Sequence, residues 1–128
     1  MSNKNNILIL DDDPVLITFL EKYFSNEGYL IHTANTVSEG VRKVLDHSPD
    51  LIVCDINIGF LNGRDFLELM KNIKYCDRII FITGEQKERT EKFLLNCKID
   101  KEDLIFKPLD LPALKSRIAV KLRNLGPT

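Results

Sequence analysis

Polar side chains that could bind a phosphoryl group stand directly after short apolar runs of the chain. They comprise carboxylates, a hydroxyl and an ammonium: Asp11, Asp12, Asp13, Asp55, Thr83 and Lys107. Clustered carboxylates repel one another unless a cation neutralises them, and Mg2+ prefers such oxygen ligands. A carboxylate can also attack a phosphoryl group and form an aspartyl phosphate. These residue types therefore predict a Mg2+-dependent phosphoryl site, in which a hydroxyl and an ammonium balance the charge of the phosphoryl oxygens.

Each of these residues also has a simpler structural explanation. Asp12 or Asp13, which precede a proline, could only cap the start of a helix. Thr83 could be a turn residue, and Lys107 could be a solvated surface charge. Each simple explanation is favoured when its residue is taken alone. The set as a whole argues against them, because four apolar runs end in the residue types that one phosphoryl site needs.

Apolar runs and helical spacing predict the elements that position these side chains. Four continuous runs suit strands covered on both faces: 7–10, 51–54, 79–82 and 104–106. The mixed segment 29–34 suits an edge strand. Apolar residues three or four positions apart predict five helices, the first with Val15 and Phe19 in its core-facing stripe and the weakest around 93–97. Alternating strands and helices predict a doubly wound parallel α/β sheet, whose strands all end at one edge.

The composition indicates one globular domain. The 128 residues carry 18 basic and 19 acidic side chains, so no strong positive field favours nucleic acid as a direct partner. The cysteines, Cys54, Cys76 and Cys97, lack zinc-type spacing and indicate reduced thiols. No apolar run approaches the roughly 20 residues that cross a bilayer, and no signal peptide is recognisable. We therefore expect a cytoplasmic protein that binds no membrane.

The strand-end pattern resembles the receiver domain of two-component response regulators. The resemblance rests on Ile-Leu-Ile-Leu-Asp-Asp-Asp-Pro at 7–14, Asp-Leu-Ile-Val-Cys-Asp at 50–55, Ile-Ile-Phe-Ile-Thr at 79–83 and Lys-Pro at 107–108. It extends from about residue 6 to about residue 124. It implies a single receiver domain over 1–128, with 125–128 as a tail or the start of a linker. The implied fold is flavodoxin-like, with five parallel strands in the order 2-1-3-4-5 and five helices.

The resemblance implies a phosphoacceptor and a set of metal ligands. Asp55 matches the acceptor, which takes its phosphoryl group from the phosphohistidine of a sensor histidine kinase or a histidine phosphotransfer protein. Asp12, Asp55 and the backbone carbonyl of Asn57 match the direct Mg2+ ligands, and Asp11 would act through a metal-bound water. A domain of this kind is a signalling switch rather than an enzyme, although it carries its own phosphotransfer and autodephosphorylation chemistry.

The same resemblance assigns switch and tuning positions. Thr83 matches the hydroxyl that moves towards the phosphoryl group, and Lys107 matches the lysine that pairs with it and is followed by a cis peptide bond to proline. Asn57 and Glu85 match positions that influence dephosphorylation, and the pair is similar to that of the chemotaxis receiver. This similarity predicts a short-lived phosphoryl group. Phosphorylation would change a partner surface near the fourth and fifth helices, towards an output that the sequence does not identify.

Several positions depart from the family pattern. Leu104 occupies the position where the family has Tyr or Phe, so the usual aromatic readout is atypical here. We expect strand alternation to turn Phe106 to the opposite face from Leu104. Gly59 replaces a proline, which gives its loop more backbone freedom. The charged segment 97–103 is expected to be a solvated loop.

Two other classes of function compete with the switch. Asp11 and Asp13 fit the motif of haloacid-dehalogenase-like phosphatases, with Asp11 as nucleophile and Asp13 as acid/base. That alternative lacks a later acidic motif, needs a longer chain and leaves Asp55 unexplained. A phosphorylation-independent adaptor would keep the fold only for protein contacts, and the intact set of acids argues against it.

Overall fold

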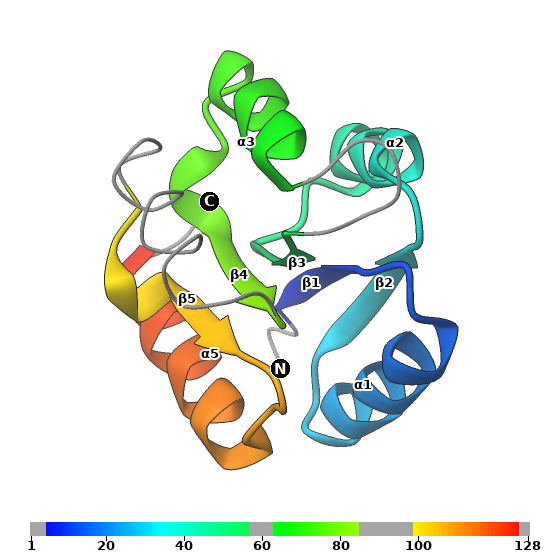
Figure 1. The fold of residues 1–128 in the computed structure, drawn as a ribbon, viewed down its shortest axis with the longest axis vertical. Helices are drawn as coiled ribbons and strands as arrows, with labels where there is room; N and C mark the ends of the chain where they lie inside the picture. Colours follow the sequence, from blue (N-terminus) through cyan, green and yellow to red (C-terminus); the bar gives the residue numbers. More distant parts are fainter. Residues whose placement is uncertain (1–4, 57–62, 85–98, 126–128) are drawn as a thin grey trace.

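A computed structural model describes residues 5–56, 63–84 and 99–125. One parallel sheet has the order β2-β1-β3-β4-β5 (Figure 1), as predicted. Its strands are β1 (Asn6–Leu10), β2 (Leu30–Ala34), β3 (Leu51–Asp55), β4 (Ile79–Thr83) and β5 (Leu104–Phe106). The described α-helices are α1 (Pro14–Asn26), α2 (Val37–His47), α3 (Gly63–Asn72) and α5 (Leu111–Leu125). The helix predicted around 93–97 lies outside the described residues.

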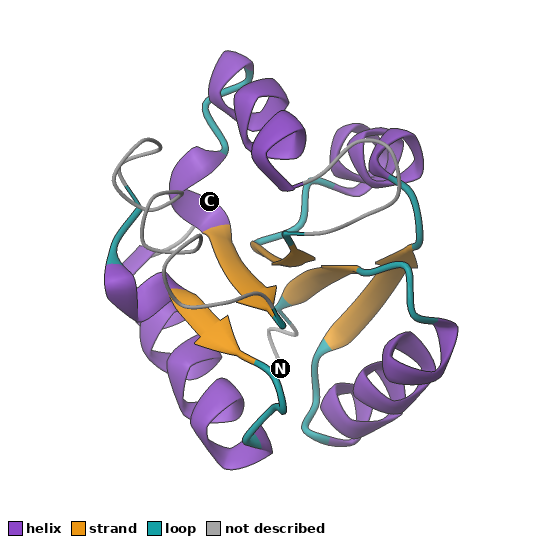
Figure 2. Ribbon diagram, viewed as in Figure 1, coloured by secondary structure: helices purple, strands orange, loops and turns teal. Residues whose placement is uncertain are grey.

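Helices cover both faces of the sheet, with α2 and α3 on one face and α1 and α5 on the other (Figure 2). Alternate residues of β1 divide between the two layers. Leu8 and Leu10 pack in the layer of α2 and α3, whereas Ile7 and Ile9 pack in the layer of α1 and α5. Continuous apolar runs are needed because both faces of each central strand are buried. None of the helices in the described ranges is long and apolar enough to cross a membrane.

The start of α1 resolves which acid acts as a helix cap. Asp13 is the N-cap, and its Oδ1 accepts hydrogen bonds from the backbone N–H groups of Val15 (3.0 Å) and Leu16 (3.4 Å). The cap explanation therefore applies to Asp13, whereas Asp12 lies exposed just before it. α1 begins at Pro14, shortly after β1 ends at Leu10. Its first turn therefore lies beside the edge of the sheet where the acids stand.

The expected apolar stripe of α1 is partly wrong. The helix buries Ile17, Leu20 and Phe24, which share one face at a period of 3.6 residues. Val15 and Phe19 lie on the other side of the helix, with 77% and 53% of their surface exposed. Spacing by three or four positions alone cannot decide which of two adjacent stripes meets the sheet.

Near β5, one expectation is wrong and another is partly wrong. Leu104 and Phe106 stand opposite Phe81 and Thr83 in the register of β4, two positions apart, so both side chains leave the same face of the strand. Leu104 is buried in the core, whereas Phe106 is 42% exposed. The solvated loop predicted over 97–103 is exposed at 100–102, but Lys101–Asp103 forms a short 3-10 helix, η2, and Asp103 is buried. Residues 97 and 98 lie outside the described residues.

Candidate phosphoryl and metal site

Parallel register brings the acids to one edge of the sheet. β1 pairs with β3 so that Leu10 stands opposite Cys54. Asp11 and Asp55 are the next residues on these neighbouring strands, so they emerge at the same height. A site at the carboxyl ends of the strands is the arrangement that open α/β sheets use for ligands.

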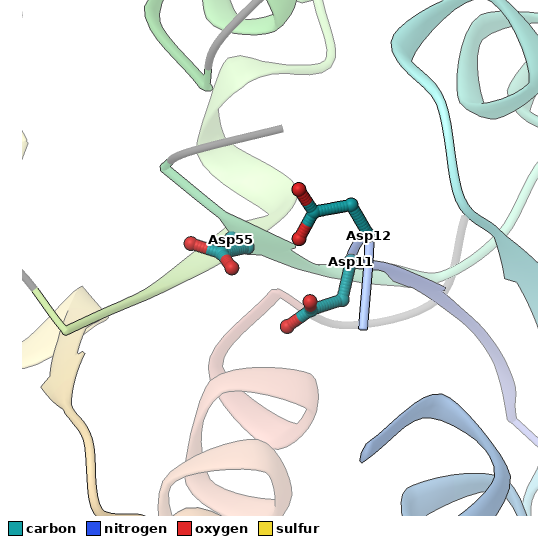
Figure 3. Close-up of side chains that lie close together, drawn as sticks. All are labelled: Asp11, Asp12 and Asp55. Carbon is teal, nitrogen blue, oxygen red and sulfur yellow. The ribbon is translucent and has the colours of Figure 1, made fainter. Parts of the chain in front are cut away.

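The carboxylates of Asp11, Asp12 and Asp55 converge on the same space (Figure 3). One oxygen atom from each lies within 4.8 Å of the others. Asp11 is fully buried and Asp55 is 5% exposed, whereas Asp12 is exposed to solvent. The cluster is thus closed on the Asp11 side and open on the Asp12 side. Hard oxygen donors with access to water are what Mg2+ requires, since this ion retains several of its waters.

Lys107 reaches the carboxylates from the end of β5. Its Nζ donates to Asp55 Oδ2 at 3.1 Å and to Asp11 Oδ2 at 3.4 Å. Its backbone N–H donates to the carbonyl of Thr83 at 2.7 Å, which holds the start of the loop against β4. The Lys107–Pro108 peptide bond is cis, as the resemblance implied. Burial lowers the pKa of Lys107, but the hydrogen bond and charge of Asp55, together with Asp11, outweigh burial and raise it.

The buried carboxyl of Asp11 is harder to ionise than an ordinary aspartate. Burial raises its pKa from 3.8 to about 6. The charge of Asp55 adds to this effect, while the backbone N–H of Asp13, 2.9 Å from Oδ1, and the ammonium of Lys107 oppose it. Among the described residues, three carboxylates meet one ammonium at this edge, so negative charge exceeds positive charge there. A cation from solution would relieve that excess, so the donor set fits a divalent metal.

Thr83 and Leu104 complete the described part of the site. Thr83 is fully buried at the carboxyl end of β4, between the ends of β3 and β5. The next residue, Gly84, is exposed, and an added Cβ there would meet only the side chain of Lys107, at 3.8 Å. Leu104 packs in the core of the α2 and α3 layer. Asn57 and Glu85 lie outside the described residues, so their metal and dephosphorylation roles stay predictions.

Two features beside the site were not predicted from the sequence. The thiol of Cys54 donates to the carbonyl oxygen of Asp55 at 3.2 Å, and burial raises its pKa well above the usual range. A groove also runs beside Lys107, with Phe19 on one wall. Phe19 itself could have indicated this groove, as an aromatic side chain on the exposed face of α1. The apolar spacing of the sequence instead placed it in the core-facing stripe.

Known proteins share both the sequence pattern and the fold. The response regulator receiver domain family matches residues 7–119. The response regulator ArlR of Staphylococcus aureus is 32% identical over 118 residues, which make up 92% of this chain and 52% of that protein. The chain therefore spans about half the length of the curated relatives it matches.

Solved structures support the same assignment. A CheY-like receiver domain protein from Methanospirillum hungatei JF-1 has a TM-score of 0.84 at 28% identity, covering 95% of this chain and 96% of that one. A two-component response regulator from Clostridium difficile has a TM-score of 0.86 at 24% identity, covering 97% and 100%, which is a likeness of fold.

These relatives give no support to the phosphatase alternative. The acid/base of that mechanism would be Asp13, and this carboxylate instead caps α1. The matched segment includes every described residue of the carboxylate cluster. The chain belongs to the family of response regulator receiver domains.

Proposed function

We propose that this receiver domain is a switch in which Asp55 accepts a phosphoryl group from the phosphohistidine of a sensor histidine kinase or a histidine phosphotransfer protein. The observation that carries the proposal is the ammonium of Lys107, 3.1 Å from Asp55 at the edge of an acidic cluster. A carboxylate oxygen of Asp55 would attack phosphorus as the bond from phosphorus to the imidazole nitrogen breaks. Lys107 would then balance charge on a phosphoryl oxygen.

The surroundings of the two buried acids favour Asp55 over Asp11 as acceptor. Asp11 is fully buried, and its two oxygens accept bonds from the backbone of Asp13 and from Lys107. Asp55 is 5% exposed and also accepts from Lys107, but it stands at the end of β3 beside the solvent-exposed Asp12. An incoming phosphoryl group would therefore approach Asp55 from the open side of the cluster.

Asp12, Asp55 and the backbone carbonyl of Asn57 would hold Mg2+, with Asp11 acting through water. The bound ion would supply positive charge that balances the carboxylates and the phosphoryl oxygens. The three converging carboxylates support this role for the described ligands. The part assigned to Asn57 rests on the resemblance, because that residue lies outside the described ranges.

Signal output would begin at Thr83. Its hydroxyl would move towards the phosphoryl group, and the change would reach a partner surface near the fourth predicted helix and α5. Leu104, which is buried where the family has an aromatic ring, makes this readout atypical. The partner that reads it would be an output domain or a separate protein. We further propose that residues 1–128 form one receiver domain, with 125–128 as a tail or linker, and that it works in the cytoplasm.

Phosphorylation by acetyl phosphate in MgCl2, followed by intact mass, tests the acceptor. The native protein should gain one phosphoryl group, and Asp55→Asn should reduce the gain to background because the nucleophile is lost. Asp77→Asn is the matched control, since this exposed aspartate lies before β4, away from the site. Label that survives Asp55→Asn but is lost in Asp11→Asn would contradict the proposal and restore the phosphatase mechanism.

The lifetime of the phosphoryl group tests the tuning pair. Asn57 and Glu85 would give rapid self-dephosphorylation, as their similarity to the chemotaxis receiver implies. The measurement is the decay of the intact-mass signal after removal of acetyl phosphate, with Mg2+ kept present. A half-life of many hours would rule out this part of the proposal.

A further inference from the structure

Phe106 is a half-exposed aromatic side chain next to two residues of the proposed phosphoryl site. β5 is the edge strand beside β4 (Figure 1), and Phe106 stands opposite Thr83 in their register. The next residue is Lys107, whose backbone N–H donates to the carbonyl oxygen of Thr83 and whose Nζ lies 3.1 Å from Asp55. Phe106 is therefore joined through the chain to one proposed phosphoryl contact and lies beside the other.

The side chains of Thr83 and Phe106 leave the same face of the sheet. Phe81, which stands two positions before Thr83, packs in the layer of α2 and α3. Leu104, two positions before Phe106, packs in the same layer. Because side chains alternate along a strand, Thr83 and Phe106 both point towards that layer. Neighbouring strands lie about 4.8 Å apart, so a change in side-chain volume at Thr83 changes the space available to the ring.

Leu104 and Phe106 differ in how much surface they have left to bury. Leu104 lies in the core and is only 8% exposed, so an inward movement would gain it little. Phe106 keeps 42% of its surface exposed at the end of the edge strand. Burial of apolar surface stabilises a protein in proportion to the area that leaves water. Phe106 is therefore the side chain of β5 that would gain most from an inward movement.

We propose that Phe106 couples the acceptor site to the protein surface, because its ring turns inward when the hydroxyl of Thr83 moves towards a phosphoryl group on Asp55. The inference rests on the proposed acceptor role of Asp55. The movement of Thr83 vacates space beside the ring on the same face of the sheet. The ring then buries its exposed surface there, and this burial stabilises the phosphorylated conformation. The coupling side chain thus stands two residues beyond Leu104, the position where the family has its aromatic ring.

A single fluorophore can follow the ring, because the chain contains no tryptophan and Phe106→Trp introduces one. The probe is beryllium fluoride in MgCl2, which binds an aspartate carboxylate as a tetrahedral mimic of the phosphoryl group. The emission of Phe106→Trp should shift to shorter wavelength when the probe is added, since the indole leaves water. The shift should be lost when Thr83→Val is combined with Phe106→Trp, because valine keeps the branched shape of threonine but lacks its hydroxyl.

Isothermal titration of beryllium fluoride measures what burial of the ring contributes. Phe106→Ala should weaken binding by roughly three- to tenfold, which corresponds to burial of the exposed part of one phenylalanine side chain. Phe106→Trp should restore most of the native affinity, because it keeps an aromatic ring. Leu69→Ala is the matched control, since Leu69 on α3 is also 42% exposed. It should change binding by less than about twofold, as expected of a surface substitution away from the site.

Binding of the probe to Phe106→Trp without a shift to shorter wavelength would overturn the coupling and leave Asp55 as the acceptor. A shift that persists with Thr83→Val would also overturn it, as would equal weakening by Phe106→Ala and Leu69→Ala. If Phe106→Trp does not bind the probe, the comparison of Phe106→Ala with Leu69→Ala decides. A native protein that neither binds beryllium fluoride nor gains label from acetyl phosphate would instead contradict the acceptor role of Asp55, and the coupling with it.

Discussion

Two clusters of charge stand at opposite edges of the sheet and are neutralised differently. At the carboxyl edge, the carboxylates of Asp11, Asp12 and Asp55 converge, and Lys107 bonds two of them. At the amino edge, just before β5, a single buried carboxylate meets two cations. Asp103 accepts from Lys121 Nζ at 2.8 Å and from an Arg117 guanidinium nitrogen at 2.8 Å, and Arg117 also pairs with Glu102 at 3.5 Å.

The difference separates a cluster whose charges pair within the fold from one in which the described carboxylates outnumber their ammonium partner. The Asp103 cluster balances itself and joins η2 to α5, so it needs no ion from solution. In the described part of the carboxylate cluster, three carboxylates meet one ammonium, and burial raises the pKa of Asp11 to about 6. A folded protein can retain such an imbalance where a bound cation completes the site.

The largest expected effect is a loss of stability when the Asp103 cluster is broken. Asp103→Ala would leave the ammonium of Lys121, which is 8% exposed, without its carboxylate partner. Removing one partner of a buried pair should lower the free energy of unfolding by about 3–5 kcal/mol. Urea denaturation measures this change.

Glu102→Ala is the matched control, because Glu102 joins the same cluster with 77% of its side chain exposed. An exposed pair is worth about 1 kcal/mol or less. Equal destabilisation by the two variants would contradict the distinction between a buried balanced pair and its exposed neighbour.

Removing a negative charge from the carboxylate cluster should instead raise the free energy of unfolding. Asp11→Asn should raise the free energy of unfolding of the metal-free protein at neutral pH by about 1–2 kcal/mol, after a discount for solvent screening on the open side. The raised pKa of Asp11 means that its stabilisation is complete below its ordinary pKa of 3.8 and is lost as pH rises through about 6.

Urea denaturation across this pH range, in the absence of divalent metal, checks the sign. The native protein should lose stability relative to Asp11→Asn as pH rises from about 4 to about 6. Mg2+ should then stabilise the native protein more than the variant, because a ligand that binds the folded state stabilises it. A native protein that is the more stable of the two without metal would refute the imbalance.

The smallest effect comes from another titrating group, His32. It sharpens the comparison because its pH dependence is opposite to that of Asp11. His32 on β2 stacks on His47 with ring centroids 4.0 Å apart, and its Nε2 lies 2.7 Å from the side-chain oxygen of Asn6. Burial, then the charges of His47 and Lys43, lower the pKa of His32 below 6.5. Its contribution to stability is present above 6.5 and is lost as pH falls through the lowered value.

Introducing His32→Gln into the Asp11→Asn protein isolates this contribution. The acid-side loss of stability below about pH 6.5 should become shallower, because the group that resists protonation in the fold is gone. The midpoint of urea denaturation, followed from about pH 7.5 to about pH 5, measures the slope. An unchanged slope would show that the protonation of His32 is not coupled to folding.

Much of the site could be predicted because strand ends are local features. An apolar run followed by an acid, a threonine or a lysine is visible in sequence, and parallel pairing brings those ends to one edge. The prediction failed where packing against other elements decides whether a side chain is buried. The exposed Phe19 and the buried Asp103 both contradicted it, because amphipathic spacing does not choose between adjacent faces and charge alone does not reveal a distant partner.

The sequence by itself determined the strands, their common edge and the residue types that stand there, since hydrophobic periodicity and strand-end composition are written along the chain. Tertiary structure alone decided that Asp13 caps α1 while Asp12 faces Asp55, and that Lys107 crosses to both buried acids. It also decided that, among the described residues, carboxylates and cations are equal in number in the Asp103 cluster, whereas carboxylates outnumber the ammonium in the other cluster. Those outcomes depend on distances between side chains far apart in sequence, which exist only after the sheet and its helices have packed.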